Sequence, residues 1–105
     1  MVRANHSIKS FLRYNRFMRK LEKTLKACAN VSRLKILEYL KKNEVASVLD
    51  IANATKFSYR AVSKHLGILY STDMVEREQS GYEMLYRISS HLSPLASSIL
   101  KHVPS

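Results

Sequence analysis

Two helix-start signals, close together in the middle of the chain, constrain its fold more than any other feature. The stretch SVLDIANAT begins with a capping-box pattern, in which Ser47 is the N-cap and Asp50 stands three positions later. Ser58 is a second N-cap, and Phe57 before it is placed to pack against Val62 as a hydrophobic staple. Only the short connection ATKF separates the two helices, so the spacing predicts a helix-turn-helix.

The segments on either side of this pair complete an order of elements. Apolar residues at helical spacing, followed by a change to period two, predict five helices and a β-hairpin. The predicted helices cover about residues 8–29, 32–42, 48–52, 58–71 and 92–102, and the predicted strands cover about 75–79 and 82–88. We expect Asn30 or Ser32 to cap the second helix and Asn43 to close it, with Ser80-Gly81 between the strands.

This order predicts a mainly α protein with a small β-hairpin, arranged as a winged helix-turn-helix (α-α-α-α-β-β-α). With 105 residues, the chain is expected to form one domain. Its parts are a basic N-terminal helix (1–29), a winged helix-turn-helix core (30–90) and a C-terminal helix (91–105).

The charge is strongly positive and unevenly distributed. The chain has 18 Lys and Arg against 8 Asp and Glu, a formal net charge of +10, which favours a polyanion or an anionic membrane surface as partner. Residues 1–26 hold one acidic residue, Glu22, and most of the excess basic ones: Arg3, Lys9, Arg13, Arg16, Arg19, Lys20, Lys23 and Lys26.

The same N-terminal segment carries a heptad-like apolar seam. The members of this seam alternate at spacings of three and four residues: Phe11, Tyr14, Met18, Leu21, Leu25 and Cys28. Leu12 and Phe17 widen the apolar stripe. Such a seam needs a partner surface, which the rest of the domain, another chain or a membrane interface could supply. The winged-helix pattern after it favours packing against protein.

The second helix of the helix-turn-helix has two distinct sides. Val62, Leu66 and Leu69 fall together and are expected in the core. The outward side carries Tyr59, Arg60, Ser63, Lys64 and Gly67. A solvated helix face often has such residues, but this one follows a turn of the right length, and no acidic residue lies between positions 50 and 73.

These outward residues suit recognition of double-stranded DNA, because the second helix of the motif enters the major groove. Arg60 can donate two hydrogen bonds to guanine, and Ser63 and Lys64 can reach bases or phosphates. Tyr59 offers a hydroxyl to a phosphate or its ring to a thymine methyl. Ser58 stands at the helix N-terminus, where backbone N–H groups favour a phosphate oxygen.

The segments ANVSRLKILEYL and LDIANATKFSYRAVSKHLGILYSTDMVEREQSGYEMLYRIS resemble the ArsR/SmtB family of winged-helix repressors. The resemblance covers about residues 29 to 89. Its motif positions are Arg33, Ile36, Leu37 and Leu40 in the first helix pattern, Ser58, Val62, Ser63, His65, Leu66 and Leu69 in the second, Met74-Val75 after it, and Tyr86-Arg87-Ile88 at the end of the wing.

This resemblance implies a sequence-specific, dimeric regulator of transcription, a repressor, whose two recognition helices (58–71) read a palindromic operator. It implies a homodimer formed by the first and last helices, which agrees with the apolar seam. The expected interface residues are Phe11, Tyr14, Met18, Leu21, Leu25, Leu92, Leu95 and Ile99. For His65 two roles stay open: half-buried packing with a polar tip, and a phosphate contact.

The sequence departs from the family at its metal-sensing sites. The segment VASVLDIA contains no thiol where one family site has a Cys-x-Cys pair. His91 and His102 match the central spacing of a second site, but Ser89 and Ser105 replace its other ligands. We therefore expect no metal and no cofactor, and His91 and His102 remain weak candidates. No effector can be named.

The wing departs as well, because Glu76, Glu78 and Glu83 surround Arg77. Arg77 and Gln79 are still expected to touch the DNA backbone or minor groove. Phosphate contacts are expected to come instead from Lys56 and from the first helix, through Arg13, Arg16, Lys20 or Lys23. The alternative is that the charges of the first helix face solvent beside the dimer interface.

Other classes of protein fit less well. Cys28 is the one cysteine and is expected to be a buried hydrophobe. The four histidines are scattered and no catalytic constellation appears, so we expect no enzyme. With no spanning segment or signal peptide, the chain is expected in the cytoplasm and not in a membrane. The alternative function is a winged-helix protein-interaction module or a non-specific architectural DNA-binding module.

Overall fold

A computed structural model describes residues 4–105 of the chain, with side chains from Ser7 onward. Arg3 and the side chain of His6 lie outside this part. The described elements, in chain order, are α1 (Ala4–Cys28), α2 (Val31–Asn43), β1 (Ala46–Ser47), α3 (Val48–Thr55), α4 (Tyr59–Ser71), β2 (Val75–Ser80), β3 (Glu83–Ile88) and α5 (Pro94–His102). The predicted winged helix-turn-helix order is confirmed, with one short strand added.

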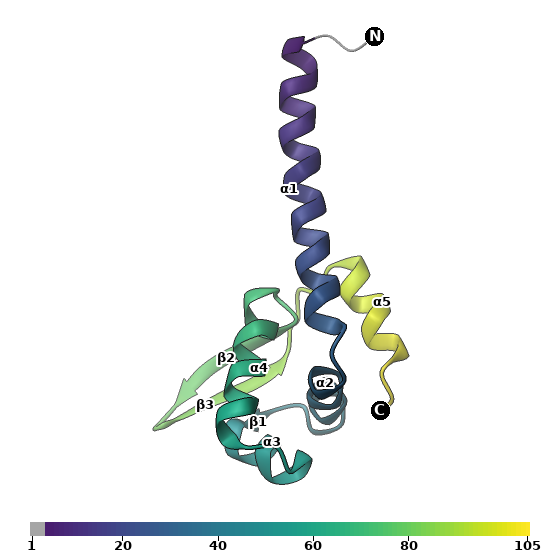
Figure 1. The fold of residues 1–105 in the computed structure, drawn as a ribbon. Coiled ribbons are helices and arrows are strands. Elements are labelled where there is room, and N and C mark those ends of the chain that lie inside the picture. Colours follow the sequence, from purple (N-terminus) through teal and green to yellow (C-terminus); the bar gives the residue numbers. More distant parts are fainter. Residues whose placement is uncertain (1–3) are drawn as a thin grey trace.

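Helix α1 stands out from the rest of the molecule (Figure 1). Its 25 residues span about 37 Å at 1.5 Å per residue, and the molecule as a whole measures 57 × 30 × 22 Å. The remaining elements gather around the C-terminal end of α1, where Thr24, Ala27 and Cys28 are buried. Most described side chains of α1 therefore do not pack against other elements of the chain.

The helix starts follow the predicted caps. The side chain of Asn30 accepts a hydrogen bond from the Arg33 N–H at 3.0 Å and begins α2. Ser47 and Asp50 form both hydrogen bonds of the capping box at the start of α3. Ser58 accepts from the Ala61 N–H at 3.1 Å and begins α4. Each cap satisfies an N–H that the first helical turn leaves unpaired.

The small sheet has the order β1-β3-β2, and all of its pairs are antiparallel. β2 and β3 form the predicted hairpin, with Val75 opposite Ile88 and Ser80 opposite Glu83. The strand β1 was not predicted: two residues, Ala46 and Ser47, pair with β3 just before the capped helix. This pairing attaches the middle of β3 to the helix-turn-helix.

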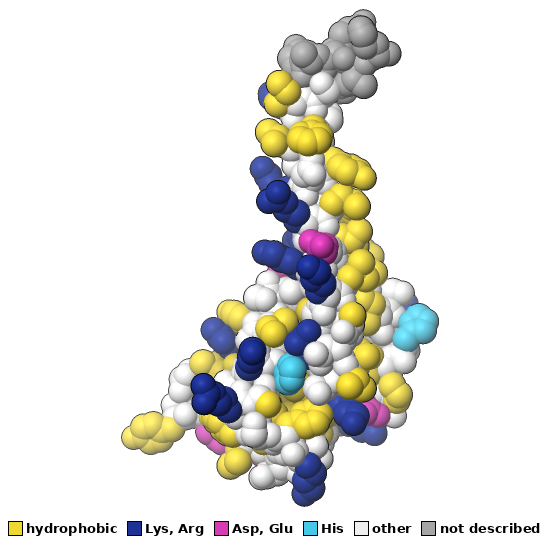
Figure 2. Space-filling view, viewed as in Figure 1, with side chains coloured by type: hydrophobic (Ala, Val, Ile, Leu, Met, Phe, Trp, Pro, Cys, Tyr) yellow, Lys and Arg dark blue, Asp and Glu magenta, His cyan; other side chains and the backbone are white. Residues whose placement is uncertain are grey.

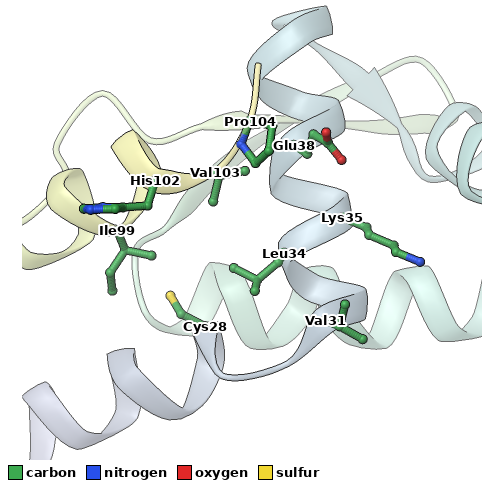
Figure 3. A pocket seen from close by; sticks show the side chains of 9 residues that line it. All are labelled: Cys28, Val31, Leu34, Lys35, Glu38, Ile99, His102, Val103 and Pro104. Atoms are coloured by element: carbon green, nitrogen blue, oxygen red, sulfur yellow. The ribbon is translucent and has the colours of Figure 1, made fainter.

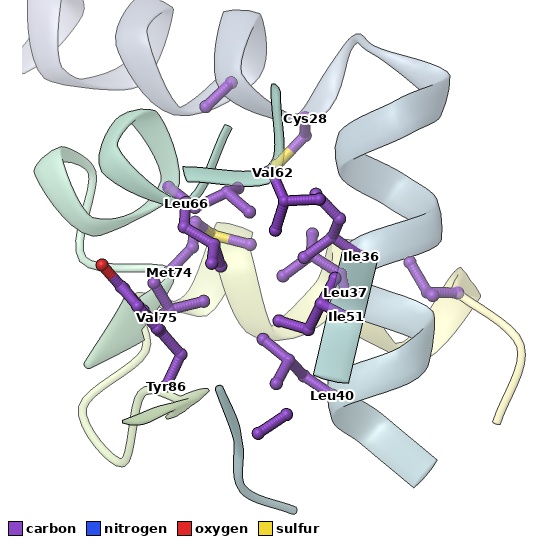
Figure 4. Close-up of a cluster of buried hydrophobic side chains, with 14 of the residues drawn as sticks. Cys28, Ile36, Leu37, Leu40, Ile51, Val62, Leu66, Met74, Val75 and Tyr86 are labelled. Atoms are coloured by element: carbon purple, nitrogen blue, oxygen red, sulfur yellow. The ribbon is translucent and has the colours of Figure 1, made fainter. Parts of the chain in front are cut away.

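The core lies between α2, α3, α4 and the start of the hairpin (Figure 4). The largest fully buried side chains are Ile36, Leu37, Leu40, Ile51, Val62, Leu66, Leu69 and Met74. The three residues predicted for the inner side of α4 are all among them. Burial of a Leu or Ile side chain contributes about 1.5–3 kcal/mol, so this side holds α4 firmly in place.

Several element boundaries differ from the prediction. Helix α1 begins at Ala4 instead of about residue 8, and α3 continues to Thr55 instead of about residue 52. Asn43 does not close α2, because its side-chain amide donates back to the Tyr39 carbonyl and the C-cap is Glu44, at φ 57°. The hairpin turn is Gly81-Tyr82 and not Ser80-Gly81, since Ser80 still pairs in β2. Helix α5 begins at Pro94, which follows the N-cap Ser93, so Leu92 precedes the helix.

Candidate nucleic-acid interface

Helix α4 presents its predicted outward side to solvent. Its inner residues Val62, Leu66 and Leu69 have no exposed surface. The outward residues Tyr59, Arg60, Ser63, Lys64 and Gly67 are all exposed, and so is Ser58 at the helix start. A Cβ placed on Gly67 would meet nothing within 4 Å, so this position leaves open space on the outward side.

The turn before α4 is tight because one non-glycine residue takes a left-handed conformation. Lys56 is the C-cap of α3 at φ 65°, and its N–H donates to the Ala52 carbonyl at 2.9 Å. Its side chain is exposed beside the start of α4. Among the described residues, no ion pair involves Lys56, Arg60 or Lys64. Their charges are therefore available to an external anion.

His65 lies at the inner edge of this surface and is half-buried. Its Nδ1 is 3.2 Å from Nη1 of Arg33, whose Nε donates to the Ala27 carbonyl at 2.6 Å and whose Nη2 donates to the Lys26 carbonyl at 3.3 Å. Arg33 thus joins the end of α1 to α4. Burial, then the charges of Arg33 and Lys64, lower the pKa of His65, which favours the neutral ring that accepts from Arg33.

The wing, formed by β2 and β3, meets the far end of α4 through an aromatic contact. The guanidinium carbon of Arg77 lies 3.9 Å from the centre of the Tyr70 ring, a cation–π geometry. A hydrogen bond to Tyr86, across the hairpin, raises the pKa of Arg77 above its ordinary value. Arg77 remains exposed and charged at the junction of α4 and the wing.

The acidic residues of the wing are partly neutralised within the hairpin. Arg87 contacts Glu78 at 3.1 Å and Glu76 at 3.7 Å. Glu76 also accepts a hydrogen bond from the Ser90 N–H at 3.2 Å. The side chain of Gln79 donates to the Gly81 carbonyl, beside a fully exposed Tyr82 at the tip. These pairings reduce the acidic repulsion that the sequence indicated for this surface.

Helix α1 carries two stripes on different sides (Figure 2). Basic side chains line the side that continues toward α4, and apolar side chains line the side that continues toward α5. The predicted phosphate-contacting residues Arg13, Arg16, Lys20 and Lys23 are all exposed. This separation gives the molecule a basic side and an apolar side.

The predicted dimer residues on α1 are largely without partners in their own chain. Phe11 is 64% exposed and Tyr14 is 61% exposed, values that decide against packing within the chain. Met18 and Leu25 are also exposed, and Leu21 is half-buried. In and before α5, Leu92, Leu95 and Ile99 are half-buried, while Ala96 and Leu100 face the core. The apolar seam therefore remains open to another chain.

An apolar pocket lies where the end of α1, α2 and α5 meet (Figure 3). It is lined by Leu34 and Ile99, by the thiol of Cys28, and by His102 at the end of α5. Cys28 is buried, as predicted, and burial raises the pKa of its thiol. A buried thiol with a raised pKa is a poor nucleophile and a poor metal ligand near neutral pH.

The two weak metal-ligand candidates do not meet in a single chain. His91 is exposed before α5, and His102 stands at its other end, where Nδ1 is 2.9 Å from the Ser98 carbonyl oxygen. Among the side chains that the structure describes, from Ser7 onward, no group of three or more metal-ligating residues is found.

The central part of the chain matches a known family of DNA-binding proteins. Residues 30–77 match the model of the bacterial regulatory proteins of the arsR family, which covers α2, α3, α4 and the first residues of the wing. The chain carries an ArsR-family helix-turn-helix domain. This match confirms the resemblance drawn from the sequence motifs. No curated protein sequence matches the chain.

Solved structures agree with the match to an ArsR-family domain. The chain is similar to the homodimeric winged helix-turn-helix DNA-binding domain of a possible ArsR-family regulator from Mycobacterium bovis (29% identity, TM-score 0.71, 85% of this chain and 76% of that chain). It is similar to the transcriptional repressor PagR of Bacillus anthracis (28%, 0.68, 83% and 95%) and to the transcriptional regulator HlyU of Vibrio vulnificus (26%, 0.64, 88% and 92%).

These ArsR-family relatives are transcriptional regulators and not enzymes, in agreement with the expectation from the sequence. In the described part of the chain, no helix is long and apolar enough to span a membrane.

Three residues of the interface were missed from the sequence. Tyr70 is seven positions after Ser63 and therefore on the same side of α4, so helical periodicity could have identified it. Arg33 gave no such signal, because its contact with His65 joins residues 32 positions apart. The pairing of Arg87 with Glu78 depends on the register of the hairpin, and the predicted turn was displaced by one residue.

Proposed function

We propose that this ArsR-family protein is a repressor that binds a palindromic operator as a homodimer in the cytoplasm, with α4 of each protomer in the major groove. The observation that carries the proposal is the outward side of α4. It holds exposed Arg60, Ser63 and Lys64 on a helix whose opposite side is completely buried. A rigid helix with free hydrogen-bond donors is what recognition of base edges requires.

The predicted contacts take different roles in this proposal. Arg60 and Ser63 recognise base edges, and Tyr59 packs on the groove wall or a thymine methyl. Lys56 and Lys64 contact phosphates, and Arg77 reaches the backbone beside the wing, with Gln79 near it. The hydroxyl of Ser58 already accepts from the Ala61 N–H. Ser58 therefore supports binding chiefly by holding the helix start in place.

The contribution of His65 is to position α4 rather than to contact DNA. Its Nδ1 faces Arg33, and the ring is half-buried. Of the two roles left open by the sequence, packing with a polar tip is the one that this geometry supports.

The homodimer is supported by the open apolar seam of α1 and by the homodimeric state of the related Mycobacterium bovis domain. Met18→Glu places a charge in the middle of the seam, whereas Leu49→Glu places the same charge at an exposed apolar residue of α3, outside the predicted interface on α1 and α5. We expect sedimentation velocity to show that M18E dissociates and L49E does not. If M18E sediments like the unsubstituted protein, the seam is not the interface.

Selection of bound sequences from random duplex DNA tests specific recognition. We expect a palindrome with half-sites about one helical turn apart. Arg60→Ala should lose discrimination at one base pair by about 1–3 kcal/mol, or roughly 5- to 150-fold. Lys101→Ala on α5 is the matched control and should leave the selected sequence unchanged. Non-specific enrichment would instead favour an architectural module, and no enrichment would favour a protein-interaction module.

A further inference from the structure

A second charged surface on α1 continues the basic side of the molecule beyond α4. Its cations recur at spacings of four, three, four and three residues: Lys9, Arg13, Arg16, Lys20 and Lys23. At 100° per residue these five positions fall within about 80° of one another. We call them the basic stripe. The apolar seam lies on another side of the same helix (Figure 2).

The basic stripe lies on the side of α1 that packs against the helix-turn-helix. Ala27 follows Lys23 by four positions, so it occupies the same side, and it is 2% exposed. Arg16, Lys20 and Lys23 also line one groove together with Ser71, the last residue of α4. The basic stripe is therefore continuous with the C-terminal end of the proposed recognition helix.

The charge of the basic stripe is uncompensated. The one acidic residue of α1 in its described part, Glu22, contacts Lys26 at 3.5 Å, outside the stripe. No ion pair involves any of the five stripe residues among the described side chains. Like charges three or four positions apart destabilise a helix by a few tenths of a kcal/mol per pair. A bound polyanion would relieve this repulsion.

We infer that the basic stripe binds backbone phosphates of the duplex next to the half-site that α4 recognises. Lys9 and Lys23 are separated by about 21 Å along the helix axis, at 1.5 Å per residue. That length corresponds to roughly six base pairs at 3.4 Å each. The stripe thus lengthens the contacted DNA without reading its sequence, and it adds the affinity that the partly neutralised wing does not supply. This inference rests on the proposed function of α4.

The test compares two triple variants with the same change in net charge. Arg13→Gln, Arg16→Gln and Lys20→Gln together remove the middle of the basic stripe. The control, Lys35→Gln, Lys42→Gln and Lys101→Gln, removes three exposed cations from α2 and α5. Circular dichroism and sedimentation of both variants establish that the fold and the dimer are retained before binding is measured.

Operator binding is then measured between about 50 and 200 mM salt, using a duplex obtained by the selection described above. We expect the stripe variant to bind roughly tenfold or more weakly at low salt. The slope of log affinity against log salt concentration should be smaller in magnitude by about one for each phosphate that the variant no longer binds. Ethylation of phosphates just outside the half-site should weaken the unsubstituted protein and not the stripe variant. The selected sequence itself should not change.

Equal affinity and equal salt dependence of the two triple variants would overturn the inference, as would equal ethylation interference in the unsubstituted protein and the stripe variant. Sedimentation with vesicles rich in phosphatidylglycerol provides a further arm: stripe-dependent vesicle binding without an effect on DNA assigns the stripe to a membrane surface and refutes the inference. A failure of the proposed function is distinguishable, because no operator would be selected by the unsubstituted protein.

Discussion

Arg33 is the residue whose replacement most directly tests how α4 is held in place. Its guanidinium makes three contacts: Nε with the Ala27 carbonyl at 2.6 Å, Nη2 with the Lys26 carbonyl at 3.3 Å, and Nη1 with His65 Nδ1 at 3.2 Å. Both carbonyls belong to the last turn of α1, where a helix has no further N–H groups to offer. We expect Arg33→Met, which keeps an apolar side chain, to remove all three contacts.

The magnitude follows from the number and quality of these hydrogen bonds. Hydrogen bonds to charged groups contribute about 1.5–3 kcal/mol each. Arg33 is half-buried and two of its contacts are longer than 3.1 Å, so solvent screening reduces their share. We therefore expect the free energy of unfolding to fall by about 2–4 kcal/mol. Arg33→Lys should recover only part of this, because an ammonium lacks the planar fork that reaches three acceptors.

Urea unfolding followed by circular dichroism measures this loss, at one fixed protomer concentration because dimerisation is linked to stability. Arg60→Met is the control: it removes an exposed arginine without an ion pair and should change the free energy of unfolding by less than about 0.5 kcal/mol. A loss below about 1 kcal/mol for Arg33→Met, or full recovery by Arg33→Lys, would refute the reasoning.

Three further predictions follow from single side chains. Since folding lowers the pKa of His65, the unfolded chain binds more protons between that lowered value and about 6.5, so the free energy of unfolding should decrease as pH falls through this window. His65→Asn keeps an acceptor for Arg33 without titrating, so it should reduce this dependence in urea titrations at several pH values; an unchanged slope would contradict the assignment. Cys28, buried and with a raised pKa, should react with a thiol reagent much more slowly in the native protein than in urea, and equal rates would show that it is accessible. Gly81→Ala should destabilise by about 1 kcal/mol because Gly81 has φ +62°, whereas Gly67→Ala in the open middle of α4 should stabilise by up to about 1 kcal/mol; thermal unfolding that gives both changes the same sign would contradict this.

The helix caps show how much of the fold could be predicted from short segments. Asn30, Ser47 and Ser58 all cap the helices assigned to them, because each cap uses a backbone N–H only three residues ahead. The hairpin was equally visible in its period-two alternation. By contrast, β1 could not be predicted, because two residues give no period and their pairing depends on β3, almost forty positions later.

Part of the candidate interface could likewise be predicted from the sequence, and part of it could not. The exposed side of α4 was predicted because 3.6-residue periodicity assigns every position of a helix to a side once Val62, Leu66 and Leu69 are taken as core. The sequence could not show that Arg77 lies over Tyr70, since that contact depends on how the wing folds back onto α4. It also could not show that Arg87 pairs with the acidic residues of the wing.

The sequence by itself determined the helices and the hairpin, the N-caps, the inner side of α4 and the two stripes of α1, because these depend on periodicity and on contacts within one helical turn. Only the tertiary structure decided what those surfaces meet. It left most of the apolar seam of α1 without a partner in its own chain and aligned the basic stripe with the end of α4. It also joined α1 to the recognition helix through Arg33 and His65, which are 32 positions apart. The physical reason is that contacts over such separations require the packed core to bring the elements together, and no local pattern encodes them.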